Sequence, residues 1–234
     1  MAKTINGSDD KNGHQFDSGD FRGTITWRIF RIMAEFVEGF QFLASLKKTV
    51  SILGSHTLAT SDPYYQEACD LGEMLGRGGF TVITGGGQGV MEAANKGAAK
   101  VKAPSVGLNI QLPPPDGEVS NPYLNKSVSF HYFFTRKVMF SFSAQAYVFF
   151  PGGYGTLDEF TEILCLVQTH KIKKVPIILM DKDFWQPFVE WVKKEILPRN
   201  MVSPEDLNLF YIVDSAEEAY DIIKKTPIRK VDLD

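Results

Sequence analysis

The sequence predicts an α/β fold, a single domain with a parallel β-sheet and helices on both faces. From residue 49 onward, short β-rich runs alternate with helical patterns, which is the chain order of a parallel sheet. Runs such as 147–150 are apolar throughout, as strands buried on both faces are. Three runs end in glycine-containing turns, and an open α/β sheet binds ligands beyond the carboxyl ends of its strands. We therefore expect these turns to gather at one edge of the sheet.

Size and composition fit that fold and limit the classes of function. The chain has 234 residues, of which 44% are hydrophobic, enough for one large domain or one domain with an extension. A formal net charge of −3 argues against a nucleic-acid-binding protein, which usually carries a basic excess. The two cysteines, Cys69 and Cys165, lack metal-type spacing, so we expect two ordinary buried thiols in a reducing compartment.

Two segments precede the predicted domain. Residues 1–23 are polar, without the apolar stretch of a signal peptide, and we expect a disordered tail. Residues 24–46 predict an amphipathic helix, because apolar residues recur three or four positions apart. Its charges are mixed, with two arginines followed by Glu35 and Glu38. A membrane-surface helix prefers a uniformly basic polar face, so packing on the domain or on a second copy is favoured.

Residues 47–234 predict the sheet domain. The predicted strands are 49–53, 80–84, 105–110, 127–131, 147–150, 175–180 and 210–213. The predicted helices are 63–77, 90–100, 133–144, 156–170, 184–196 and 216–225. The segment 111–125 holds four of the twelve prolines and predicts an irregular loop over the surface. No stretch of the sequence is long and apolar enough to span a membrane, and we expect a cytoplasmic protein.

The first glycine loop follows the predicted strand 80–84 and leads into a helix at Val90. Its residues are Gly85, Gly86, Gly87, Gln88 and Gly89. Glycines let the backbone approach an anion, and the free N–H groups of the helix start favour a phosphate. The alternative is a tight turn without a ligand. The loop is not a dinucleotide fingerprint, because Val90 stands where the last glycine would be, and it is not a Walker sequence.

The second glycine loop has the same architecture and adds an acidic residue. A buried strand runs into Pro151, Gly152, Gly153, Tyr154 and Gly155, and Thr156 begins the predicted helix, where it can serve as the N-cap. Glu159 has two interpretations. Three residues after an N-cap at Thr156, it would complete a capping box. Beside a phosphate-binding loop, it would instead be a catalytic carboxylate.

Two adjacent cations, Arg136 and Lys137, lie early in the predicted helix 133–144. Positive charge disfavours a helix N-terminus, so the placement is locally unfavourable. Local rules tend to fail at functional sites, which favours a binding role. The alternative is a solvated pair that reaches past aromatic side chains to water.

Together these segments resemble the Lonely Guy (LOG) family, whose members are often labelled lysine decarboxylases. Residues 151–159, PGGYGTLDE, resemble the family motif P-G-G-x-G-T-x-x-E, and the Arg136–Lys137 pair matches the pair upstream of it. Residues 85–91 resemble the family's glycine loop with slightly different spacing, and Gly54 with Ser55 its first-strand pair. The agreement extends over residues 50–213, and the N-terminal helix resembles a bacterial branch with an extension.

The resemblance implies a Rossmann-like fold, a homodimer or larger homo-oligomer, and phosphoribohydrolase activity. The substrate would be a nucleoside 5′-monophosphate, such as a cytokinin riboside monophosphate or AMP, and the products free base and ribose 5-phosphate. By motif position, Arg136 and Glu159 would be the catalytic pair. The predicted binding residues are Ser55, Gly86, Gly87, Gly89, Lys137, Gly152, Gly153, Tyr154, Gly155 and Thr156. His56 and His131 depart from the family pattern and could alter substrate choice.

The predicted chemistry needs no metal and no cofactor. Breaking the bond between ribose and base builds positive charge on the sugar, which the carboxylate of Glu159 would stabilise while it orients or deprotonates water. Arg136 could grip phosphate or ribose, or keep Glu159 ionised. The alternative function is a nucleotide-binding or sensing protein without turnover. A lysine decarboxylase has no support, since no pyridoxal-phosphate lysine site is recognisable, and we expect neither nucleic acid nor membrane as a partner.

Overall fold

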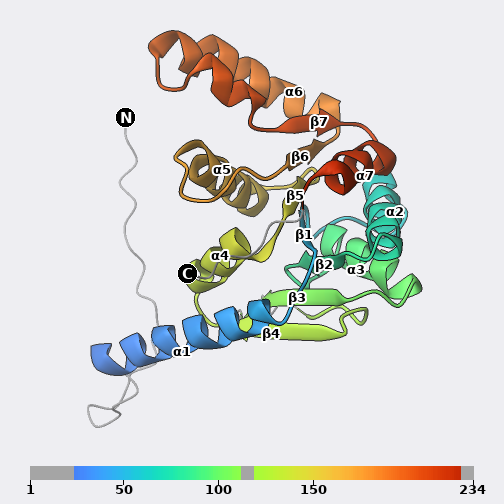
Figure 1. Ribbon diagram of the computed structural model, residues 1–234, viewed down its shortest axis with the longest axis vertical. Coiled ribbons are helices and arrows are strands. Elements are labelled where there is room, and N and C mark those ends of the chain that lie inside the picture. The colour runs from blue at the N-terminus through green and yellow to red at the C-terminus, as the bar shows by residue number, and fades with distance from the viewer. Residues whose placement is uncertain (1–23, 112–118, 228–234) are drawn as a thin grey trace, which may run out of the picture.

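The fold is a seven-stranded sheet in which all neighbouring strands are parallel (Figure 1). The computed structural model describes residues 24–111 and 119–227. The strands are β1 (Thr49–Leu53), β2 (Thr81–Thr84), β3 (Ser105–Ile110), β4 (Lys126–Phe130), β5 (Ala146–Phe149), β6 (Ile177–Met180) and β7 (Tyr211–Val213). The predicted single α/β domain with a Rossmann-like sheet is confirmed, and the predicted strand boundaries hold within two residues.

The strand order creates a switch point between β1 and β5. The order is β4-β3-β2-β1-β5-β6-β7, so the chain builds outward from β1 to one edge and then returns to the other side of β1. Leu53 pairs in register with Phe149, which brings the ends of these two central strands together. Helices diverge to opposite faces at such a point, and the crevice that opens there is where α/β sheets bind ligands.

Helices cover both faces of the sheet. They are α1 (Ile25–Ala44), α2 (Pro63–Arg77), α3 (Val90–Lys100), α4 (Phe133–Ser143), α5 (Tyr154–Gln168), α6 (Lys182–Trp191) and α7 (Ala216–Lys225). A π-helical turn (Val192–Ile196) and a 3-10 turn (Leu197–Arg199) continue α6, and a second 3-10 turn (Pro204–Asn208) precedes β7. Figure 1 shows α2, α3 and α7 on one side of the sheet and the other helices on the opposite side.

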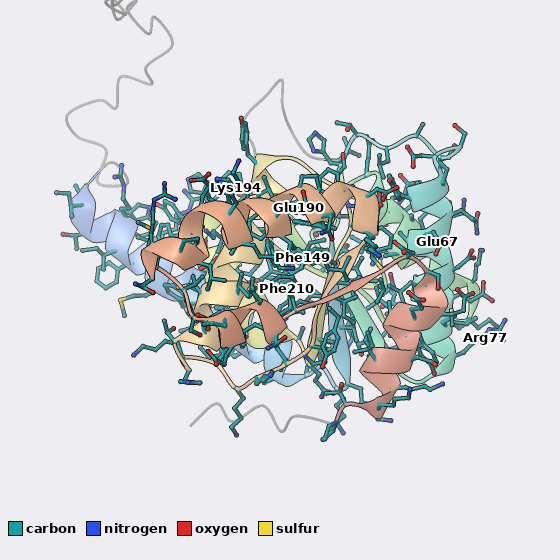
Figure 2. The ribbon with its side chains drawn as sticks, turned by 90° about the horizontal axis from the view of Figure 1, so that it is seen from above. Glu67, Arg77, Phe149, Glu190, Lys194 and Phe210 are labelled. Atoms are coloured by element: carbon teal, nitrogen blue, oxygen red, sulfur yellow. The ribbon has the colours of Figure 1, made fainter. Side chains whose placement is uncertain are left out.

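Alternate residues of one strand enter two separate cores. Ala146 and Val148 of β5 pack with α2, α3 and α7, whereas Tyr147 and Phe149 pack with the helices of the opposite face. Figure 2 shows Phe149 in the interior, with Glu190 and Lys194 on the helical layer above it. This two-sided burial explains why the run 147–150 is apolar throughout.

The N-terminal helix α1 packs on the domain, as its mixed charges indicate. It contacts α4 and β4, and the two helices approach closely at Gly39, where a Cβ atom would lie 2.5 Å from the sulfur of Met139. The predicted tail 1–23 and residues 112–118 of the predicted loop 111–125 lie outside the described residues. Among the helices that the structure describes, none combines the length and apolar character needed to cross a membrane.

The outer face of α1 supports the predicted homo-oligomer, which stays a prediction. This face exposes Ile25, Trp27, Ile29, Phe30, Met33 and Val37, and Phe133 and Phe134 of α4 are exposed as well. Contiguous apolar side chains of this kind mark association surfaces. We expect a dimeric or larger mass by light scattering at micromolar concentration, and a lower mass for the Phe30→Ser, Met33→Ser double variant. A monomeric mass for the unaltered protein would contradict the prediction.

Candidate functional site

A cavity of about 450 Å³ lies at the carboxyl ends of the central strands. Ser55 and His56 line it after β1, Gly85 after β2, and the segment that follows β5 contributes residues from Gly153 to Glu159. Arg136 and Lys137 of α4 enter from one side. The expectation that both glycine loops meet at one edge of the sheet is thus confirmed, and the volume suits a mononucleotide-sized ligand.

Most, but not all, of the predicted site residues reach this cavity. Its lining includes Ser55, Arg136, Lys137, Gly153, Tyr154, Gly155, Thr156 and Glu159. Among the described residues, Gly86, Gly87, Gly89 and Gly152 are not part of the lining, and their contact with a ligand stays a prediction. His56 lines the cavity, whereas His131 does not belong to the lining.

Two glycines of the first loop that do not line the cavity, Gly86 and Gly89, are required by the backbone conformation of the loop. Gly86 (φ +80°) and Gly89 (φ +64°) adopt backbone conformations that disfavour side chains, and a Cβ on Gly89 would lie 2.4 Å from the carbonyl oxygen of Ser55. The tight turn alone is therefore enough to explain glycine at these two positions. Gly85 remains at the cavity wall, where a Cβ would lie 2.2 Å from Nη2 of Arg136.

A buried asparagine, Asn121, which no sequence pattern indicated, holds the first loop through hydrogen bonds. The side chain of Asn121 donates to the carbonyl oxygens of Gly86 (3.2 Å) and Gly87 (2.9 Å). Its backbone N–H also donates to Gly86 (2.9 Å). Asn121 belongs to the segment predicted to run over the surface, yet it is only 5% exposed. Asparagine in a proline-rich loop is ordinarily a turn residue, so no local signal indicates this contact.

The second loop starts its helix earlier than predicted, and this removes the structural explanation for Glu159. Helix α5 begins at Tyr154 with Gly153 as its N-cap and without a side-chain cap. The predicted N-cap at Thr156 and the capping box with Glu159 are therefore wrong. Thr156 is the third helical residue, so Glu159 lies too far along the helix to complete a box.

Contacts within the protein do not explain why two positions of this loop are glycine. Among the described residues, a Cβ atom on Gly153 or Gly155 would meet nothing within 4 Å, and Gly153 has an ordinary extended backbone with φ of −89°. Glycine in a helix costs about 0.5–1 kcal/mol relative to alanine, and Gly155 accepts this cost in the first turn of α5. Both residues line the cavity, so they leave backbone N–H groups open to a ligand that approaches closely.

Glu159 has an unusual protonation equilibrium. The pKa of its carboxyl is raised to about 7, mainly by burial. The charge of Arg136 acts against this shift, as does that of Lys137, whereas the charge of Asp158 adds to it. A carboxyl with such a pKa exists in both protonation states near neutral pH. Perturbed groups in a cleft are typical of catalytic acids and bases.

Arg136 joins three parts of the site. Its Nε donates to the carbonyl oxygen of Leu108 in β3 (2.6 Å), and its Nη2 donates to that of Gly85 (3.2 Å). The side chain packs over the ring of Phe140 and is 9% exposed. The solvated-pair alternative is therefore wrong for Arg136, since its guanidinium is held at the cavity wall.

Lys137 forms ion pairs with acidic side chains of α5. Its ammonium lies 2.8 Å from Asp158 and 3.2 Å from Glu162. Desolvation opposes its charge, yet the hydrogen bonds that it donates to Asp158 and Glu162 raise the pKa of Lys137 overall. The residue thus links α4 to α5 and neutralises the acidic side chains behind the loop. Within the described ranges, no three His, Cys, Asp or Glu side chains group as ligands of a metal ion would.

Comparison with known proteins identifies the family. A family model described as "Possible lysine decarboxylase" matches residues 91–223, more than half of the chain. The chain belongs to this family. It is the LOG family that the motifs resemble, so the resemblance is confirmed. An uncharacterized protein of Archaeoglobus fulgidus is 34% identical over 95 residues, which are 41% of this chain and 60% of that protein. The match thus spans less than two thirds of that relative's length.

Solved structures with the same fold include two molybdenum-cofactor proteins. The molybdenum cofactor binding protein of Rippkaea orientalis superposes with a TM-score of 0.59 at 23% identity, over 77% of this chain and 97% of that chain. The molybdenum cofactor carrier protein of Chlamydomonas reinhardtii gives a TM-score of 0.57 at 19% identity, over 77% and 98%. At these identities the likeness concerns the fold alone.

Proposed function

We propose that this LOG-family protein hydrolyses the N-glycosidic bond of a nucleoside 5′-monophosphate to release free base and ribose 5-phosphate. The second loop is the observation that carries the proposal. It combines two glycines with open space before them, a helix N-terminus, and one turn further on a carboxyl with a pKa of about 7. A phosphate site and a carboxylate at one cavity suit a phosphorylated sugar as substrate.

The N-terminus of α5 would hold the phosphate. The first intrahelical bond of α5 runs from the N–H of Leu157 to the carbonyl oxygen of Gly153 (3.0 Å). The N–H groups of Tyr154, Gly155 and Thr156 precede that bond and have no acceptor within the helix. Such groups, together with the positive end of the helix dipole, bind phosphate readily.

Glu159 would act at the anomeric carbon. As the bond between C1′ and the base nitrogen breaks, the ribose gains positive charge, which an adjacent carboxylate stabilises. Water then forms the new C1′–O bond, and the proton that it loses ends on the base nitrogen. Arg136 would support the ionised form of Glu159, because its positive charge lowers the pKa of that carboxyl.

The direct test is incubation of purified protein with a panel of nucleoside 5′-monophosphates and the matching nucleosides. We expect free base from at least one nucleotide and little from its nucleoside. Gly155→Ala is the informative variant, because the added methyl group would enter the space assigned to the phosphate. It should keep or raise thermal stability while it weakens nucleotide binding. Equal rates for nucleoside and nucleotide would contradict the proposal.

A carrier that binds a phosphorylated ligand without turnover is the alternative that the same assay separates. Two structural neighbours are named for binding or carrying molybdenum cofactor. A carrier would not need Glu159 as a catalytic carboxylate. Nucleotide binding by calorimetry without release of base would favour the carrier.

The pKa of Glu159 predicts how turnover depends on pH. Only the ionised carboxylate stabilises the cationic sugar, so kcat/KM should rise with pH through the pKa of about 7. Below that pH the rate should fall about tenfold per pH unit, since each unit lowers the ionised fraction tenfold. Initial rates from pH 5 to 9 measure this profile. A midpoint near 4.5, the ordinary value for glutamate, would contradict the assignment.

A further inference from the structure

The start of helix α4 lacks the features that normally stabilise a helix N-terminus. Its N-cap, Tyr132, makes no side-chain cap hydrogen bond, and no acidic residue lies in its first turn. Instead, Arg136 and Lys137 place positive charge near the positive end of the helix dipole. Another part of the molecule must therefore compensate for the free N–H groups.

Glu35 of α1 supplies a negative charge at this end of the helix and binds the residues that lead into it. Its Oε1 accepts from the backbone N–H of His131 (2.9 Å), and its Oε2 accepts from that of Tyr132 (3.4 Å). The hydroxyl of Thr135 lies 2.6 Å from Oε2 and 2.7 Å from the carbonyl oxygen of Tyr132, so the two acceptors share its one proton. Because Thr135 is completely buried, this charge-assisted contact is partly shielded from water. One carboxylate thus accepts two backbone hydrogen bonds and contacts the Thr135 hydroxyl at the start of α4.

The contact leads directly to the cavity. Thr135 precedes Arg136, whose backbone N–H donates to the carbonyl oxygen of Tyr132 (3.3 Å) within the same first turn. The guanidinium of Arg136 in turn holds Leu108 and Gly85. Without Glu35, the first turn of α4 would become less ordered, and the guanidinium of Arg136 would no longer be held at the cavity wall.

We propose that Glu35 is a positioning residue for the site, and that α1 orders the first turn of α4 so that Arg136 stays at the cavity wall. Figure 1 shows α1 alongside α4 at the end of the sheet that holds β4, and α1 lies outside the residues matched by the family model. The catalytic part of this inference rests on the proposed function. The structural part, order in the first turn of α4, is independent of it.

The test compares Glu35→Ala with Glu38→Ala, a matched change of an exposed glutamate on the same helix. Hydrogen exchange of the amides of residues 131–136 should become faster in Glu35→Ala and stay unchanged in Glu38→Ala. Turnover of the best nucleotide should fall on the order of 10–100-fold in Glu35→Ala, as small misplacements of catalytic groups do. The rates are measured at a temperature where circular dichroism shows both variants folded. Glu35→Gln, which keeps one acceptor, should fall between the two.

The outcomes separate the two proposals. Unchanged exchange in Glu35→Ala, or normal kcat in a folded Glu35→Ala protein whose parent is active, would overturn the positioning role. A variant that only melts at lower temperature but keeps wild-type kcat shows Glu35 to be merely structural. If the unaltered protein releases no base from any nucleotide, the proposed function fails, and the exchange measurement alone decides whether Glu35 orders α4.

Discussion

Glu159→Gln is expected to lower the release of base by about 10²–10⁴-fold, the usual contribution of a positioned acid or base. The amide keeps the shape of the side chain but lacks the negative charge that the cationic sugar requires. Because the charge is needed most in the transition state, kcat should fall while nucleotide binding is largely kept. Steady-state rates and calorimetric binding of the same nucleotide measure the two effects separately.

The melting temperature of Glu159→Gln shows whether a loss of activity reflects a loss of folding. The pKa of Glu159 is raised from 4.5 to about 7, so the contribution of this carboxyl to folding is lost as the pH rises through about 7. Glutamine has no such titration, and Glu159→Gln should melt at or above the temperature of the unaltered protein at pH 8. Glu190→Gln, an exposed acid on α6, should change neither rate nor melting temperature. Normal turnover by Glu159→Gln would overturn the proposed mechanism.

Arg136→Ala is expected to impair both folding and turnover. The change leaves the carbonyl oxygens of Leu108 and Gly85 without their charged donor, which costs on the order of 3 kcal/mol of unfolding free energy. It also removes the positive charge beside Glu159, so turnover should fall about 100-fold or more, as when one preorganised donor is lost. Urea unfolding and single-turnover rates measure the two consequences.

Two further variants test the geometry of this arginine. Arg136→Lys keeps the charge but cannot donate in a fork to two carbonyl oxygens, so it should recover only part of the activity. Arg77→Ala removes an arginine whose partner, Glu73, lies on the surface of α2, and it should behave as the unaltered protein. Full activity in Arg136→Ala would exclude this residue from the catalytic pair.

The sequence by itself determined the features that depend on local patterns. Alternating β-rich and helical runs predicted a parallel sheet, and the continuously apolar run 147–150 predicted a strand buried on both faces. Glycine turns after strands predicted where the cavity lies. The spacing of Arg136 and Glu159 relative to the second loop was sufficient to indicate the family, because such a motif is a short linear signal.

Only the tertiary structure decided which residues reach the ligand and which support the fold. Thr156 had the chemistry of an N-cap, but the path of the chain after β5 places the N-cap three residues earlier, at Gly153, so capping no longer explains Glu159. Gly86 and Gly153 look alike in sequence, yet neighbouring side chains crowd the first and leave the second open. Glu35 and His131 meet across 96 residues of chain. Contacts of that kind depend on strand order and helix packing, which local periodicity does not encode.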